Sequence, residues 1–73
     1  MDRRTLQEYL AAAEVHIEDG RLRVARQAEI VAQLKDDDRH AAMANDLLQR
    51  FKVSLSNFIQ DRDLIIRFLQ NVD

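Results

Sequence analysis

Residues 44–72 read ANDLLQRFKVSLSNFIQDRDLIIRFLQNV, and this stretch decides the fold class. Its mostly apolar seam positions recur at alternating steps of four and three, at Ala44, Leu48, Phe51, Leu55, Phe58, Arg62, Ile65, Leu69 and Val72. Steps that average 3.5 residues keep one stripe along one side of a helix, whereas a strand requires strict alternation. The stretch therefore predicts a long helix with a single apolar seam.

The first half of the chain follows the same rule. Its series is Leu6, Leu10, Ala13, Ile17, Gly20, Val24, Gln27, Val31 and Leu34. Two long helices joined by a short turn have to lie antiparallel. We therefore expect an all-α, two-helix antiparallel hairpin that forms a single domain over residues 1–73, with helices at about 6–35 and 39–70 and a turn at about 36–38.

Polar residues at the expected boundaries have the right chemistry for helix ends. Thr5 and Glu8 form the pattern of a capping box, in which Thr5 caps the first helix and Glu8 reaches back to it. Lys35 suits the carbonyl end of that helix. Residues 36–38 are three adjacent aspartates that suit a turn, and Asp38 is the predicted cap of the second helix.

The predicted seam pairs small residues of the first helix with bulky residues of the second. If the turn centres near residue 38, Gly20 lies opposite Leu55 and Val24 lies opposite Phe51. A glycine within a helix costs about 1 kcal/mol relative to alanine, so Gly20 either makes room for Leu55 or marks a hinge. The core and assembly seam is predicted to comprise Leu10, Ile17, Gly20, Val24, Val31, Leu34, Leu48, Phe51, Leu55, Phe58, Ile65 and Leu69.

Composition limits the functions that the chain can have. It has 73 residues, no cysteine, no proline and a formal net charge of −2. Cysteine ligands and disulfides are therefore excluded, and the charge gives no general attraction to nucleic acid or to anionic lipid. We see neither the apolar core of a signal peptide nor a run long enough to span a membrane. A cytoplasmic protein without cofactor or small-molecule ligand is expected.

A second set of apolar residues lies outside the seam, namely Tyr9, Ile30, Leu47, Ile59 and Ile66. Chains of this size without disulfides or metal rarely build an adequate core alone. Exposed apolar surface of this kind usually marks an interaction site. We therefore expect a homodimer that forms a four-helix bundle. The alternative is a hairpin that docks on a different protein.

Two seam positions are polar, and each has two interpretations. Arg62 is either a buried charge that sets register or an arginine whose stem covers Ala13 while its head reaches solvent or Glu14. Gln27 either pairs its buried amide across a dimer axis, where it specifies orientation, or has no such role.

A nucleic-acid-binding bundle is the second functional hypothesis. Its contacts would be Arg21, Arg23 and Arg26, the densest basic group in the chain. Plasmid-control RNA-binding hairpins that dimerise into four-helix bundles show that such an architecture can bind RNA. Against it, acids stand four residues before bases at Asp19–Arg23, Asp46–Arg50 and Asp63–Arg67, a spacing typical of ion pairs on a solvated helix face.

Neither catalysis nor metal binding is expected. His16 and His40 are the only histidines, and in a hairpin they lie too far apart to share a metal ion. The run at residues 36–38 lacks the glycine and the terminal glutamate of a calcium loop. A two-helix hairpin is also expected to offer no concave pocket of its own. Binding, and not catalysis, is therefore the predicted activity.

Three segments resemble short uncharacterised helical-hairpin proteins of bacteria. They are residues 23–34, with the pattern R-x-x-R-Q-x-x-I-V-x-x-L; residues 44–55, with A-x-x-L-L-x-x-F-x-x-x-L; and residues 61–69, with D-R-D-x-x-I-x-x-L. Such chains often have glycine in the turn, where this one has Asp38. The resemblance covers most of the chain. It implies a bacterial, cytoplasmic hairpin, and it implies no activity or catalytic residue.

Overall fold

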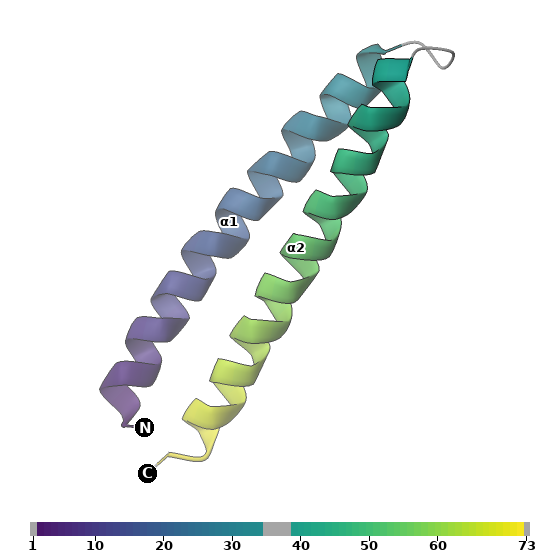
Figure 1. Ribbon diagram of the computed structural model, residues 1–73. Coiled ribbons are helices and arrows are strands. Elements are labelled where there is room, and N and C mark those ends of the chain that lie inside the picture. Colours follow the sequence, from purple (N-terminus) through teal and green to yellow (C-terminus); the bar gives the residue numbers. More distant parts are fainter. Residues whose placement is uncertain (1, 35–38, 73) are drawn as a thin grey trace.

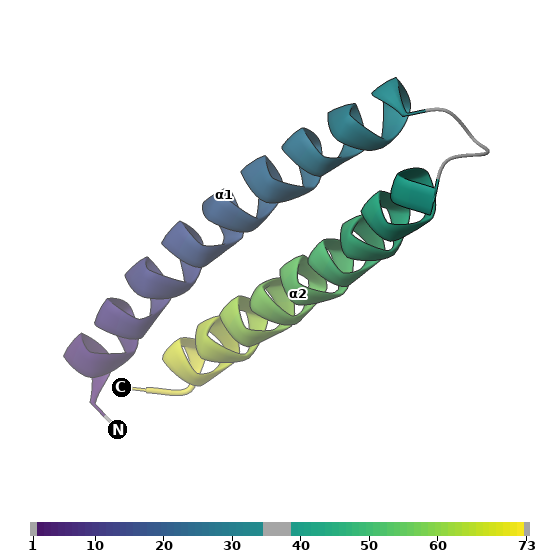
Figure 2. The ribbon, with the colours of Figure 1, turned by 45° about the horizontal axis from the view of Figure 1, so that its top comes forward.

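The computed structural model describes residues 2–34 and 39–72. Two helices, α1 (Arg3–Gln33) and α2 (Arg39–Gln70), lie side by side and antiparallel (Figure 1). The principal extents of the molecule are 57 × 13 × 12 Å. A view turned by 45° shows the same pairing, with both chain ends at one end of the hairpin (Figure 2). The predicted all-α hairpin is confirmed.

The start of α1 differs from the prediction, because the cap is Asp2 and not Thr5. The Asp2 carboxylate accepts a hydrogen bond of 2.8 Å from the backbone N–H of Thr5. That bond holds the pKa of the Asp2 carboxyl below its ordinary value of 3.8, since it favours the charged form. Glu8 lies 3.8 Å from Arg4 and does not reach back to Thr5. The earlier start adds a turn that brings Leu6, which is buried, onto the contact with α2.

The far end of α1 also comes earlier than predicted. The helix ends at Gln33, and Leu34 has extended backbone with φ −89° and ψ 150°. The N–H of Leu34 still bonds the carbonyl of Val31 at 3.2 Å. The predicted turn at residues 36–38, the Asp38 cap and the last-turn role of Lys35 lie outside the described residues. In contrast, α2 begins and ends where the sequence predicts.

The two chain ends are tied together across the hairpin. The Arg3 guanidinium donates a hydrogen bond of 2.8 Å to the backbone carbonyl of Val72. After α2 ends, the N–H groups of Asn71 and Val72 bond the carbonyls of Phe68 and Leu69. These bonds hold Val72 where its carbonyl accepts the bond from Arg3.

Seam positions of both helices form the only layer of packing in the described hairpin. Every residue of the two predicted seam series is buried or half-buried. Among the buried apolar side chains of the seam, the least exposed is Ile17, at 3%. Within the described residues no large side chain is completely enclosed. One line of contact therefore excludes water from the seam only in part.

The closest contact between the helices that involves Gly20 is with Leu55. A Cβ atom at Gly20 would lie 3.1 Å from Leu55 Cδ1 and 3.7 Å from Leu55 Cα. Helix α1 continues through Gly20 without a break. The glycine thus provides the space that Leu55 occupies, in the register that the sequence predicts.

Candidate interaction surface

The buried polar residue of the seam, Gln27, bonds within its own chain. Its Nε2 donates a hydrogen bond of 2.8 Å to the backbone carbonyl of Ala44 on α2. Only 7% of Gln27 is exposed, and a buried amide is stable only when it is hydrogen-bonded. The bond links the end of α1 near the turn to α2. A second role for Gln27 across a dimer axis stays a prediction.

The other polar seam residue, Arg62, is half-buried and its head group lies at the surface. Its Nε and Nη2 donate hydrogen bonds of 3.1 and 3.0 Å to Oδ1 of Asp63. The side chain is 31% exposed. Its partner is therefore the neighbouring Asp63, and not the predicted Glu14. A surface ion pair of this kind contributes little stability.

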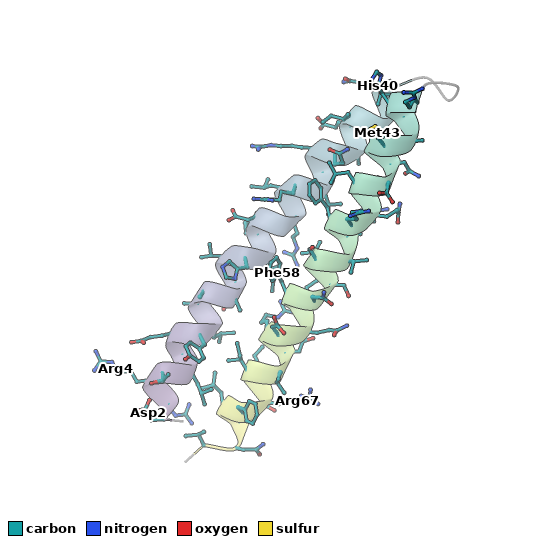
Figure 3. The ribbon with its side chains drawn as sticks, in the orientation of Figure 1. Asp2, Arg4, His40, Met43, Phe58 and Arg67 are labelled. Carbon is teal, nitrogen blue, oxygen red and sulfur yellow. The ribbon has the colours of Figure 1, made fainter. Side chains whose placement is uncertain are left out.

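A shallow hollow lies at mid-length on one side of the seam. Its volume is about 260 Å³, and it is lined by residues of both helices that include His16, Arg23, Ser54 and Phe58. The rings of His16 and Phe58 lie 5.2 Å apart, and Phe58 points into the space between the helices (Figure 3). The expectation that the hairpin has no concave surface is therefore wrong, although the hollow is open and small.

This hollow identifies which residues share a side of the hairpin. His16 and Arg23 each precede a seam residue of α1 by one position, and Ser54 does so in α2. In an antiparallel pair, positions that precede corresponding seam residues lie on the same side. We call this side, made up of the positions that precede seam residues, the apolar flank, because most of the exposed large apolar residues lie on it.

Most of the exposed large apolar residues lie on the apolar flank. Nine such residues are exposed within the described chain. Three of them, Val15, Leu22 and Val53, project away from the seam by their helical position. The other six occupy the apolar flank: Tyr9, Ile30, Met43, Leu47, Leu64 and Phe68.

These six residues gather at the two ends of the flank. One cluster, near the chain ends, consists of Tyr9, Leu64 and Phe68; the other, near the turn, consists of Ile30, Met43 and Leu47. Sequence reasoning missed Met43, Leu64 and Phe68. A second series in α2, which starts at Met43 and again advances by four and three, would have found them.

The predicted interface residues are divided between the two sides of the hairpin. Tyr9, Ile30 and Leu47 lie on the apolar flank and are exposed. Ile59 and Ile66 each follow a seam residue by one position, so they lie on the opposite side, where they are half-buried. The five predicted residues therefore do not form one continuous surface.

The three arginines of the nucleic-acid hypothesis are all exposed. Arg21 and Arg23 are separated by about 200° around α1, because each residue advances about 100°. They lie on opposite sides of the buried seam, and only Arg23 lines the hollow. Arg26 is on the same side as Arg23. The three positive charges therefore do not converge on a single face.

One of the three predicted acid–base pairs forms. The Arg50 guanidinium bonds Asp46 at 3.0 Å, whereas Asp63 bonds Arg62 instead of Arg67. Among residues 2–34 and 39–72, no three side chains of the metal-binding types are placed to hold an ion. Neither described helix contains a segment with the length and hydropathy needed to cross a bilayer.

Comparison of the chain with family models, with curated proteins and with solved structures finds no match. The resemblance to short bacterial hairpin proteins therefore stays a prediction. The apolar flank and the charges between its two clusters are therefore the features of the molecule that bear on its function.

Proposed function

We propose that this protein is a self-associating assembly module, in which two copies pack through their apolar flanks to form a four-helix bundle. The observation that carries the proposal is the position of six of the nine exposed large apolar residues on one side of the hairpin. Scattered apolar residues are normal on a protein surface, but a gathered set usually marks an interface.

The total exposed area supports the same conclusion. The chain exposes 5817 Å². A globular monomer of 8.5 kDa is expected to expose about 4,700 Å², so the hairpin has an excess of about 1,100 Å². A standard protein interface covers about 800 Å² of each partner. One flank-to-flank contact would therefore remove most of this excess.

A second copy is the economical partner because it supplies the same apolar surface. Closed two-fold dimers are the most common oligomers, and antiparallel hairpins pair readily as bundles. The function in this proposal is binding. The seam holds each hairpin together, and the flank holds the two hairpins.

Light scattering coupled to size exclusion, over a range of loading concentrations, tests the proposal. We expect twice the chain mass of 8.5 kDa. We also expect a melting temperature that rises with protein concentration, since dimerisation stabilises the folded state by mass action. A monomer mass at every concentration would contradict the proposal. Absorbance at 260 nm in the same peak would instead favour the nucleic-acid hypothesis.

Matched variants locate the interface. Leu47→Ser with Phe68→Ser removes one large residue from each cluster, and we expect the dimer Kd to rise about a hundredfold or more while the helical signal is retained. Val15→Ser with Val53→Ser changes residues of similar or greater exposure that project away from the seam. This control pair should leave the mass unchanged. Equal effects of the two pairs would count against the flank.

A further inference from the structure

We infer that the two copies pack antiparallel, with α2 lying against α2 of the partner and the turns at opposite ends of the bundle. This inference rests on the proposed self-association and names its geometry. The evidence is one exposed stripe of residues on α2. The stripe begins at Met43, advances by alternating steps of four and three, and ends at Phe68. All its members are exposed.

When the stripe is laid antiparallel on the same stripe of a second copy, each residue faces one of matching character. Its outer positions are apolar at both ends, with Met43 and Leu47 near the turn and Leu64 and Phe68 near the chain ends. Reversal places Met43 against the partner's Phe68. It also places Leu47 against the partner's Leu64. Both clusters of α2 are then covered by apolar side chains, as a stable interface requires.

The polar centre of the stripe is complementary in the same register. Reversal places Arg50 opposite the partner's Asp61, and Ser54 opposite the partner's Asn57. Because the arrangement is two-fold, the Arg50–Asp61 pair occurs twice. Within the described residues Asp61 forms no ion pair, while Arg50 bonds Asp46 along its own helix. The guanidinium has five N–H donors and can bond both carboxylates.

All four facing pairs are centred between Leu55 and Ser56, so one two-fold axis satisfies them together. That axis crosses α1 near Gly20, which lies against Leu55. On α1 the same axis places Tyr9 opposite the partner's Ile30. Neither residue belongs to the α2 stripe, so this pairing is independent support for the register.

The parallel alternative places like charges together. With both turns at the same end, α2 lies on the partner's α1, and Arg50 comes level with the partner's Arg23 and Arg26. Apolar clusters would still meet apolar clusters in that arrangement. Charge complementarity along α2 therefore favours the antiparallel direction, which is the usual contribution of charged residues to helix association.

Charge reversal tests the facing pair. We expect Arg50→Glu alone, and Asp61→Arg alone, to raise the dimer Kd at least about tenfold, since each places like charges at two positions in the dimer. An equimolar mixture of the two variants should form a heterodimer of near wild-type Kd. Gln60→Arg is the control, because it adds a positive charge one residue from Asp61 on the outer side of α2.

In a parallel dimer Arg50→Glu would tighten association, because the introduced glutamate would face Arg23 and Arg26. That result would overturn the inference. Circular dichroism should show unchanged helicity for all these variants, since every substituted position is exposed.

A distance measurement gives an independent answer. The chain has no cysteine, so Gln33→Cys provides one spin-label site, near the turn. In the antiparallel dimer the two labels are separated by about 40 Å along the bundle, at 1.5 Å per residue. In a parallel dimer both labels lie at the same end and the distance is much shorter. A short distance in a dimer overturns this inference alone, whereas a monomer overturns the proposed function as well.

Discussion

The two helices contribute unequally to their contact. Helix α1 buries five residues, which include Ala13, Gly20 and Gln27, whereas α2 buries only Ala44 and Leu48. Apart from Leu48, the bulky seam residues of α2 are half-buried. A small side chain on α1, such as Ala13 at 8% exposure, is largely covered by the larger side chains of α2, whereas a larger side chain extends beyond its small partner.

The difference separates the roles of the two helices. Packing against α2 accounts for most of what α1 buries, and α1 contributes two residues, Tyr9 and Ile30, to the apolar flank. Helix α2 keeps half-exposed seam residues, and it also carries four of the six residues of the apolar flank. The variants below test this asymmetry, from the largest expected effect to the smallest.

The largest effect is expected for Ile17→Asp, which places a charge at the most buried apolar position of α1. A buried, unpaired carboxylate should cost about 3 kcal/mol or more. That is a large share of the stability of a small domain. We expect circular dichroism at 25 °C to show loss of most of the helical signal.

Val15→Asp is the matched control for this variant. Val15 lies two residues away on the same helix and is 60% exposed. The same new charge should change the free energy of unfolding by no more than about 0.5 kcal/mol. If both variants lose their helical signal equally, the seam of α1 is assigned wrongly.

A smaller effect is expected for Gly20→Leu, which removes the size difference between residue 20 and Leu55. The new side chain would occupy the space of Leu55, and overpacking of this kind costs about 1–3 kcal/mol. Urea unfolding followed by circular dichroism measures the change in the free energy of unfolding. An unchanged midpoint would show that α1 does not need a small residue here.

Gly20→Ala sharpens the same comparison. Alanine gains about 1 kcal/mol of helix propensity over glycine. Its Cβ would lie 3.1 Å from the terminal Cδ1 of Leu55, which has to shift slightly. The two effects oppose each other, so we expect a net change smaller than about 1 kcal/mol. A large loss would mean that Leu55 cannot move.

The smallest effect is expected for Asp2→Ala. This variant tests how much the cap at the start of α1 contributes to stability, separately from the packing against α2. The folded-state pKa of Asp2 is lowered by its bond to Thr5. Its contribution to stability is therefore present above the ordinary value of 3.8 and is lost as the pH falls through the lowered pKa. The melting temperature of the variant should be slightly below that of the wild type at pH 7.

That difference should disappear in acid. Asp2→Asn is the control, since asparagine also caps helices but does not titrate in this range. It should keep the melting temperature of the wild type at pH 7. A difference between the wild type and Asp2→Ala that stays constant down to pH 2 would contradict the role of the carboxylate.

Periodicity was sufficient to predict the helices and their seam. The four-and-three spacing from Leu6 to Leu34, and again from Ala44 to Val72, depends only on helix geometry, which is the same in any context. The register that places Gly20 against Leu55 also followed, because a short turn between two long helices leaves little freedom. The sequence did not determine the first residue of helix α1, because Asp2 and Thr5 are both good caps.

The candidate surface could be predicted only in part. Tyr9, Ile30 and Leu47 were visible as apolar residues outside the seam, but the sequence did not separate them from Ile59 and Ile66. Their positions before or after a seam residue assign them to opposite sides of the hairpin only once the two helices are known to lie antiparallel. Arg21 and Arg23, by contrast, are separated by helix geometry alone, since they lie about 200° apart around α1.

Contacts between the helices depended on the folded hairpin. The bond from Gln27 to the Ala44 carbonyl joins atoms that are distant in sequence. Within α2, Arg62 bonds Asp63 and not the predicted Glu14. A one-dimensional pattern specifies which face of a helix is apolar. Only the packed pair determines which polar atoms come within bonding distance, because that distance is set by side chains of both helices together.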